Sequence, residues 1–192
     1  MKASITLIAI GILLPTLAFG QVRSEYTTFD AQKDCTVIGQ AAEGDGDWAD
    51  LVCSGYGHYP FVIRYGDARE TITYGFASQP GMDGFIPFNN AGGTIEWRVR
   101  EDRGTAHPFA AIQRWFVARA EGEGKDREVL VVSRVGQPSD GGGCVIAYVL
   151  ASGDPAANEK AREIADQRAA DFKCGMDRPE IAREASDMVV QP

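Results

Sequence analysis

The segment Thr94-Ile-Glu-Trp-Arg-Val-Arg100 decides the fold class, because large apolar and charged residues alternate along it without a break. One face carries an isoleucine, a tryptophan and a valine, and the other face carries Glu96, Arg98 and Arg100. A period of two residues is typical of a β-strand with one face in the core and one face toward solvent. The segment therefore predicts a half-buried strand in a domain built on a sheet.

Further strands are expected on both sides of this segment. Short runs rich in β-branched and aromatic residues, separated by turns with glycine or proline, are typical of antiparallel neighbours. These runs cover residues 48–53, 61–65, 69–76, 128–133 and 144–150. The segment 109–120 fits both a helical and a strand spacing. Its Trp115-Phe-Val117 run and the short glycine-containing link that follows favour a hairpin.

One long helix is expected after the last of these strands. Asp154 suits the cap of a helix, Pro155 suits its first position and Gly175 suits its end. Apolar side chains recur between them at helical spacing, at Ala157, Ala161, Ile164, Ala165 and Phe172. We therefore predict an α+β domain, in which an antiparallel sheet of six or seven strands carries one long C-terminal helix on one face. The alternative is a two-sheet β-sandwich with one helix.

Three regions are expected along the chain. Residues 1–20 combine Lys2, an apolar run and the small-residue site Ala18-Phe19-Gly20, a pattern typical of a cleaved export signal. The apolar run of about ten residues is half the length that crosses a bilayer, so we expect no stable membrane anchor after cleavage. Residues 21–175 should form a single domain that begins with a polar arm over 21–34. Residues 176–192 should form a mobile tail.

The charge of the chain narrows the classes of partner. The formal net charge is −8, and loss of Lys2 with the signal makes the exported chain more acidic still. Non-specific nucleic-acid binding depends on lysine and arginine that displace counterions from phosphates. We therefore expect no nucleic-acid partner, and an acidic surface favours a basic one.

Two disulfides are expected, because an exported chain meets oxidising conditions in the periplasm or outside the cell. The four cysteines permit three pairings, and the sequence alone does not choose among them. Proximity along the chain favours Cys35 with Cys53, across a turn rich in glycine and aspartate. It also favours Cys144, at the start of a strand, with Cys174, at the end of the following helix. The alternative of a zinc site lacks a C-x-x-C motif.

No motif predicts a catalytic or metal site, and we expect no cofactor. The acidic run over residues 43–47 resembles half of a calcium loop, but the glycine and the bidentate glutamate that such a loop requires are missing. Ser54 lies near His58 in the sequence without the glycine that precedes the serine in a nucleophile elbow.

Two groups of residues are candidates for binding. The long loop over residues 77–93 contains the apolar residues Met82, Phe85, Ile86 and Phe88. Exposed, they would anchor a partner; folded back, they would close one end of the core. The second group is Arg98, Arg100 and Arg114, which would form a small cationic site unless they pair with nearby acids.

The chain also carries a series of short aromatic motifs in a distinctive order. They are Tyr26-Thr-Thr-Phe-Asp, Trp48 shortly before Cys53, Glu96-Trp-Arg98, Arg114-Trp115 and Phe172-Lys-Cys174. This order resembles a family of small exported alphaproteobacterial proteins of unknown function. The resemblance spans nearly the whole exported chain. It implies an envelope location and no particular activity, cofactor or site residue.

These observations favour a non-enzymatic periplasmic module that binds another envelope protein or component, with Phe85 and Phe88 at the contact. Two alternatives remain open. A small hydrolase with a carboxylate-based site requires a deep pocket that holds two acids of different pKa. A carrier of small ligands requires an apolar cavity between the sheet and the helix.

Overall fold

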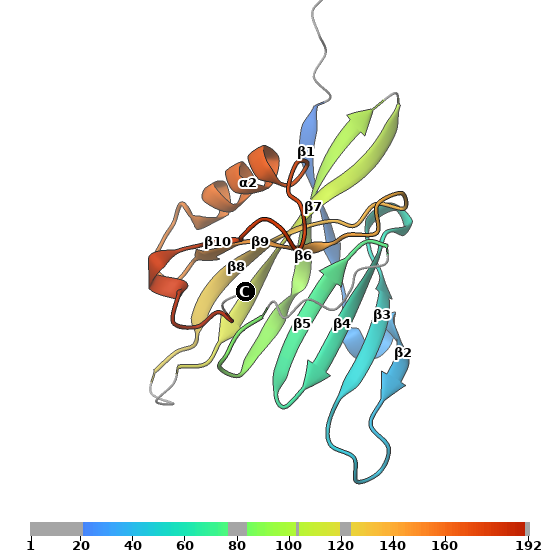
Figure 1. Cartoon of the computed structure of the whole chain (residues 1–192), viewed down its shortest axis with the longest axis vertical. Coiled ribbons are helices and arrows are strands. Elements are labelled where there is room, and N and C mark those ends of the chain that lie inside the picture. The colour runs from blue at the N-terminus through green and yellow to red at the C-terminus, as the bar shows by residue number, and fades with distance from the viewer. Residues whose placement is uncertain (1–20, 77–83, 103, 120–123, 191–192) are drawn as a thin grey trace, which may run out of the picture.

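The structure is a computed structural model that describes residues 21–76, 84–102, 104–119 and 124–190. Its strands form two sheets that pack face to face (Figure 1). The six-stranded sheet has the order β1 (Val22–Thr28), β6 (Asn89–Asp102), β7 (Thr105–Val117), β8 (Arg127–Arg134), β9 (Cys144–Leu150) and β10 (Glu180–Ile181). The four-stranded sheet has the order β2 (Cys35–Gln40), β3 (Ala49–Ser54), β4 (Pro60–Gly66) and β5 (Arg69–Tyr74). Neighbouring strands are antiparallel, except that β10 runs parallel to β9.

The prediction of a single sheet is wrong, and the two-sheet alternative describes the arrangement better. Strands β3 to β5 present an apolar face that includes Phe61, Ile63 and Tyr74, and the six-stranded sheet presents Ile95 and Trp97 opposite them. Stacking buries both apolar faces at once, whereas one continuous sheet would need a separate cover for each. Within the segment 109–120, which fitted two periodicities, residues 109–117 belong to the strand β7.

Aromatic side chains join the two sheets at the centre of the core. The ring of Tyr74 meets the ring of Trp97 edge to face, with 5.7 Å between centroids. The Tyr74 hydroxyl donates a hydrogen bond to the side-chain carbonyl of Gln113. The side-chain NH2 group of Gln113 in turn donates to the carbonyl of Gly92 over 2.5 Å. Complete burial raises the pKa of Tyr74. The hydroxyl of Tyr74 and the side chain of Gln113 therefore satisfy each other across the interface between the sheets.

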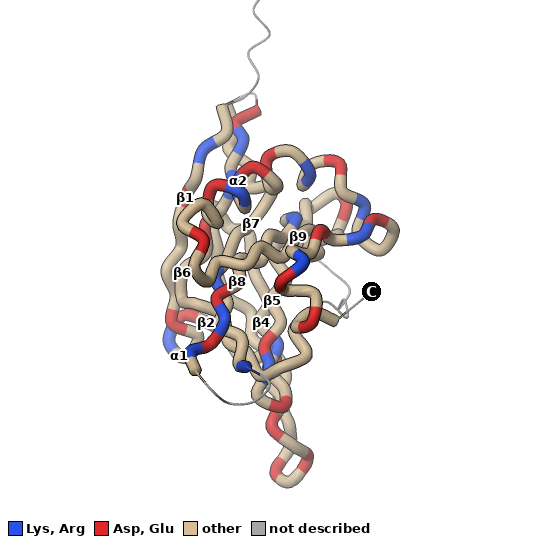
Figure 2. The backbone as a smooth tube through the Cα atoms, turned by 90° about the vertical axis from the view of Figure 1, so that its left-hand side faces the viewer, with Lys and Arg blue, Asp and Glu red and all other residues tan. Residues whose placement is uncertain are grey.

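The hairpin between β2 and β3 extends from one end of the molecule and carries only acidic charges (Figure 2). They belong to Glu43, Asp45 and Asp47, all exposed to solvent. The short helix α1 (Ala31–Asp34) precedes β2 and carries charges of both signs.

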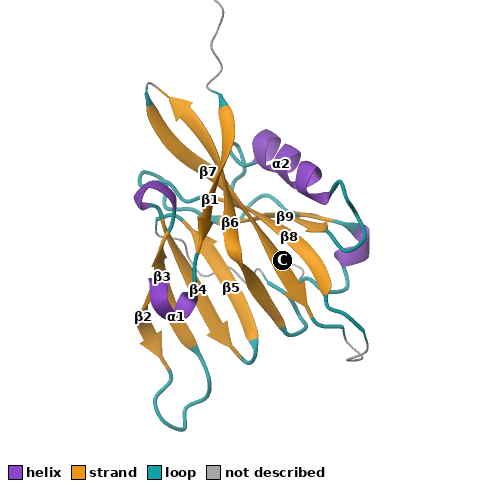
Figure 3. Ribbon diagram, turned by 180° about the vertical axis from the view of Figure 1, so that it is seen from behind, coloured by secondary structure: helices purple, strands orange, loops and turns teal. Residues whose placement is uncertain are grey.

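Helix α2 (Ala157–Arg168) covers the outer face of the six-stranded sheet (Figure 3). Its buried residues are Ala157, Ala161 and Ala165, whose small side chains let the helix approach Ile112, Val132 and Ile146 closely. The apolar stripe is as predicted, and Phe172 joins the same cluster from beyond the helix.

The helix is neither as long as predicted nor the last element of the chain. Asp154 does not cap it: its carboxylate accepts a hydrogen bond from the Ala156 amide in the preceding turn, and the helix begins at Ala157. The chain leaves the helix after Arg168, where the guanidinium lies over the Phe172 ring. The strand β10 and the 3-10 turn η2 (Arg183–Ala185) follow.

The segment after residue 176, expected as a mobile tail, packs on the sheets instead. Ala185, Met188 and Val189 are buried in the core between the sheets. The amide of Ile86 donates to the carbonyl of Met188 over 2.8 Å, and Phe85 and Val189 form a β-bridge. An alanine, a methionine and a valine near the end of the described chain thus supply apolar surface that packs in the core.

The polar arm expected over residues 21–34 contains a strand of the six-stranded sheet, β1, followed by helix α1. Strand β1 pairs with β6 along its whole length, from Val22 opposite Arg100 to Thr28 opposite Thr94. Its polar composition suits an edge strand, which has neighbours on one side only. The residues of the predicted export signal, 1–20, lie outside the described part of the chain.

Both predicted disulfides are present. Cys35 bonds to Cys53 across the paired strands β2 and β3, and Cys144 bonds to Cys174, which ties the segment after α2 to the start of β9. Each bond restricts the unfolded chain and so stabilises the folded one. Among the described residues, no helix has the length and apolar character to span a membrane.

The two sheets also meet through backbone atoms at Gly75 and Gly136. The Gly136 amide donates to the carbonyl of Tyr74 over 2.8 Å, and the Phe76 amide donates to the carbonyl of Gly136 over 3.0 Å. Gly75 has φ +90°, and a Cβ atom on it would overlap the carbonyl oxygen of Gly136. Only glycine fits this contact without strain.

We predict that Gly75→Ala lowers the free energy of unfolding by about 2–4 kcal/mol, because it adds a steric overlap to an unfavourable left-handed backbone. The matched control is Gly153→Ala, which has φ +77° and open space around its Cβ position. It should cost about 1–2 kcal/mol from the backbone term alone. Urea unfolding of both variants measures the difference, and equal losses would contradict the proposed overlap.

Candidate functional site

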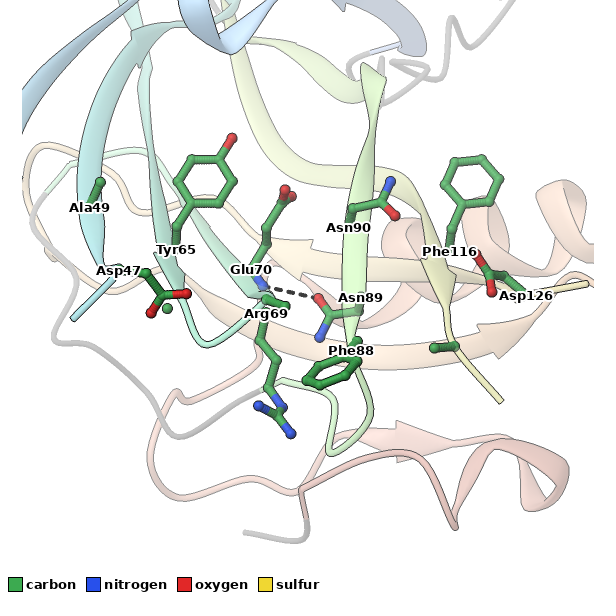
Figure 4. Close-up of a pocket in the computed structure, with 13 residues that line it drawn as sticks. Asp47, Ala49, Tyr65, Arg69, Glu70, Phe88, Asn89, Asn90, Phe116 and Asp126 are labelled. Carbon is green, nitrogen blue, oxygen red and sulfur yellow. Dashed lines mark hydrogen bonds between the residues drawn. The ribbon is translucent and has the colours of Figure 1, made fainter. Parts of the chain in front are cut away.

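A pocket of about 640 Å³ opens at the end of the sandwich where β3 and β5 begin and β4 ends (Figure 4). The start of β6 and the end of β7 form its other side. Its lining combines acidic, amide and aromatic side chains: Asp47, Ala49, Tyr65, Gly66, Ala68, Arg69, Glu70, Phe88, Asn89, Asn90, Phe116, Ala118 and Asp126. A volume of this size suits a small ligand or one or two side chains of a larger partner.

The turn between β4 and β5 fixes one wall of the pocket. Asp67 and Ala68 have φ of 51° and 54°, the left-handed conformation that a two-residue hairpin loop requires at both positions. The carbonyl of Ala68 accepts a hydrogen bond from the Asn89 amide over 3.2 Å, and the Asp67 amide donates to the Asp47 carboxylate over 3.2 Å. These contacts hold a non-glycine turn in an unfavourable conformation at the rim.

Two nitrogens of the Arg69 guanidinium are hydrogen-bonded to neighbouring groups. Its Nε donates to the carbonyl of Ile86 over 2.8 Å, and its Nη1 donates to the carbonyl and the carboxylate of Asp67. The guanidinium carbon also lies 5.0 Å from the centre of the Phe88 ring. Arg69 therefore positions Phe88 at the rim, and its charge is offset by Asp67.

Glu70 is the most buried carboxylate of the pocket. Its Oε2 accepts a hydrogen bond from the Ala91 amide over 2.8 Å, and its own amide donates to the side chain of Asn89 over 3.2 Å. Burial raises the pKa of Glu70, and the hydrogen bond from Ala91 offsets part of that rise. The pKa of Tyr65 is also raised, by burial and by the charge of Glu70.

The pocket has an uncompensated negative charge. Among the described residues, no lysine or arginine forms an ion pair with Glu70, Asp47 or Asp126. Beside these carboxylates stand the aromatic rings of Tyr65, Phe88 and Phe116 (Figure 4). Carboxylates next to aromatic faces attract cations by charge and by the ring quadrupole. The arrangement can therefore hold a cationic group on an apolar stem.

The loop predicted to bind a partner is divided between the core and the surface. Phe85 is buried and packs against Trp115 and Tyr148, whereas Ile86 and Phe88 are each 55% exposed. The fourth apolar residue of that loop, Met82, lies outside the described residues. Phe85 therefore closes one end of the core, and Phe88 is the residue that reaches the pocket.

The three predicted arginines do not form a common cationic site. Arg98 donates two hydrogen bonds to Asp166 of α2, over 2.8 and 2.6 Å. Arg114 pairs with Glu128 over 2.6 Å, and Arg100 lies over the Phe109 ring at 4.6 Å. Arg98 and Arg114 therefore pair with acids, as the alternative for this group stated, whereas Arg100 contacts an aromatic ring.

Arg98 belongs to a polar network that joins β1, β6 and α2. Its Nη1 donates to the Ser24 hydroxyl, which donates to Glu96, and Glu96 accepts two hydrogen bonds from Arg162 of α2 over 2.6 and 3.1 Å. Two ion pairs thus connect the helix to the sheet. In one the sheet supplies the cation, Arg98, and in the other it supplies the anion, Glu96. This pairing with Glu96 raises the pKa of Arg162.

We predict that Asp166→Ala lowers the free energy of unfolding by about 2–3 kcal/mol, because it leaves the buried Arg98 guanidinium without its carboxylate. Asp166→Ala combined with Arg98→Met should recover most of that loss. The control is Asp187→Ala, which removes an exposed pair with Arg127 and should cost at most about 0.5 kcal/mol. Thermal and urea unfolding test this, and a neutral Asp166→Ala would contradict it.

Glu70 and Asn89 are the pocket residues that the sequence analysis missed. A signal was present for Glu70: it stands on the same face of its strand as Ile72 and Tyr74, where an apolar residue is expected. An acid at the end of an apolar face indicates a polar opening in the core. No such signal exists for Asn89, whose role depends on the turn that it faces.

No known protein family, curated protein sequence or solved structure matches this chain. The resemblance to exported alphaproteobacterial proteins therefore stays a prediction from the sequence motifs.

Proposed function

We propose that this protein is a non-enzymatic binding module of the periplasm, and that its pocket takes up a cationic group on an apolar stem. The observation that carries the proposal is the set of three carboxylates, Asp47, Glu70 and Asp126, that line one pocket without a paired lysine or arginine in the described residues. An alkylammonium or a guanidinium supplies the missing charge.

The chemistry of the walls supports the same class of ligand. Phe88 and Phe116 offer ring faces to the methylene groups of an amine-bearing chain, and Asn90 adds an exposed amide. The acidic net charge of the whole protein raises the local concentration of cations. A basic side chain of an envelope protein and a free diamine share this chemistry.

The cysteines support the proposed compartment. All four are disulfide-bonded, a state that an oxidising compartment maintains and the cytosol does not. This agrees with the export signal predicted over residues 1–20.

A carboxylate-based hydrolase is the second candidate, because the raised pKa of Glu70 is the property that a general acid requires. Its Oε2, however, is occupied by the Ala91 amide, and the turn beside it is held by hydrogen bonds. Turnover of oligosaccharide substrates that Glu70→Gln abolishes would favour this candidate over a binding module.

The carrier alternative finds less support. The layer between α2 and the sheet is filled by the alanines of the helix and by Phe172. The pocket beside α2, between the helix and β9 and β10, is lined by charged side chains that include Lys160, Glu163 and Glu180. An apolar ligand would gain little there.

We predict that Glu70→Gln weakens the binding of a cation by about tenfold, because it removes one buried carboxylate and preserves shape. Calorimetry with cadaverine and with a capped lysine peptide separates a free amine from a basic side chain as the source of the ligand. Hexanoate, an anion of similar stem, should not bind. Glu159→Gln, an exposed acid on α2, is the matched control and should bind like the wild type. Equal binding of cadaverine and hexanoate would refute the proposal.

The pH dependence has a definite sign. The folded pKa of Glu70 lies above its ordinary value of 4.5, so the folded state holds this proton more tightly than the unfolded state. Cation binding should therefore strengthen as pH rises through the raised pKa. Without ligand, the free energy of unfolding should fall as pH rises from 4.5, the ordinary pKa, through the raised pKa of the folded state. Glu70→Gln should remove both effects, as binding and unfolding measured from pH 4 to pH 8 will show.

A further inference from the structure

Strand β2 forms an open edge of the four-stranded sheet. It pairs with β3 on one side, and among the described residues no strand pairs with its other side (Figures 1 and 3). The outer backbone amides and carbonyls of an edge strand are available to pair with another extended chain.

This edge differs from the other sheet edges in its lack of charge. Charged side chains protect natural edge strands from pairing with other chains. Each of the other edge strands carries at least one: Arg23 and Glu25 on β1, Arg69 and Glu70 on β5, and Glu180 on β10. Strand β2, with the sequence CTVIGQ, carries none. The β-bulge between Val37 and Gly39 is its one protective feature.

Two large apolar side chains of β2 are exposed beside the polar Thr36 and Gln40. Val37 is 50% exposed and Ile38 is 61% exposed, although both are typical of buried strands. Trp48, itself partly exposed, packs against Gly39 at the end of the strand. An added strand would cover this apolar surface as well as pairing with the backbone.

The charges around β2 decide what kind of strand fits. Asp34 precedes it, beside Asp30, which is already paired with Lys33, and the acidic residues of the β2–β3 hairpin follow it (Figure 2). Both ends of β2 are therefore negative. A second copy of this chain would bring acid against acid at the two ends of the joined strands, whether they ran parallel or antiparallel. A strand with basic ends would meet an opposite charge at each end.

We propose that β2 is a strand-addition site for an extended segment of another protein, with β-branched side chains in its middle and lysine or arginine at its ends. The edge of β2 lies outside the pocket lining, although the acidic hairpin contributes Asp47 to both, and the proposal does not depend on the function proposed for the pocket. Pairing joins the segment to the four-stranded sheet as a fifth strand, and the acidic hairpin fixes its charge preference.

The test uses a short peptide of alternating valine and threonine with lysines at both ends, and its counterpart with glutamates at both ends. Titration into the isotopically labelled protein should shift the amide resonances of β2 and slow their hydrogen exchange with the lysine peptide only. Added salt should weaken binding, because exposed charges are screened. Absence of shifts in β2, or equal shifts with both peptides, overturns the proposal.

A second test introduces a charge on the edge strand β2. Val37→Lys should weaken the lysine peptide roughly tenfold or more, through like-charge repulsion at the strand. Met176→Lys, which introduces the same charge at an exposed methionine outside β2, should bind like the wild type. Dimers that dissociate in Val37→Lys would assign the edge to a second copy instead and refute the proposal. The readout in each arm is the shift and the exchange protection of the β2 amides, because a lysine bound in the pocket would shift the amides around the pocket instead.

Discussion

The burial of Trp97 between the two sheets is the constraint on which the rest of the structure depends. Its indole nitrogen donates to the Thr27 hydroxyl of β1 over 3.0 Å, and its ring meets Tyr74 of β5. The ring also lies so close to Gly55 that no larger residue fits there. One side chain thus holds an edge strand of the first sheet, an edge strand of the second and the turn that follows β3.

Most of the strands could be predicted from the sequence, because period-two alternation and turn residues are local signals. The pairing of the cysteines followed from their positions beside adjacent elements. The stacking of two sheets could not be read in the same way, since alternation shows that a face is buried but not what covers it. For the same reason the strand character of 22–28 and the packing of Met188 and Val189 were missed: both depend on partners far away in the sequence.

The candidate site was predictable only in part. Phe88 was named from its apolar character in a polar loop, and it does line the pocket. The arginines were predicted from their charge, but the sequence does not show which neighbour neutralises a charged residue. Arg98 forms hydrogen bonds with Asp166 because α2 crosses the outer face of the sheet. Glu70 could have been predicted, because it is an acid on the same strand face as the apolar residues Ile72 and Tyr74.

The two sheets differ in how they are covered and in the features that they carry. The six-stranded sheet is covered on both faces, by α2 outside and by the second sheet inside. The four-stranded sheet carries the strained turn at the pocket, the acidic hairpin and the uncharged edge. Both proposed binding sites therefore involve the smaller sheet, and the pocket also takes residues from β6 and β7 of the larger one.

The bridge between Phe85 and Val189 has a consequence for the order in which the molecule forms. During synthesis from the amino terminus, the residues of strands β1 to β9 are made before Val189. Phe85 cannot form this bridge before then, so one of its neighbours in the core comes from a stretch far away in the sequence. Contacts between such distant segments form more slowly than the local pairing of neighbouring strands.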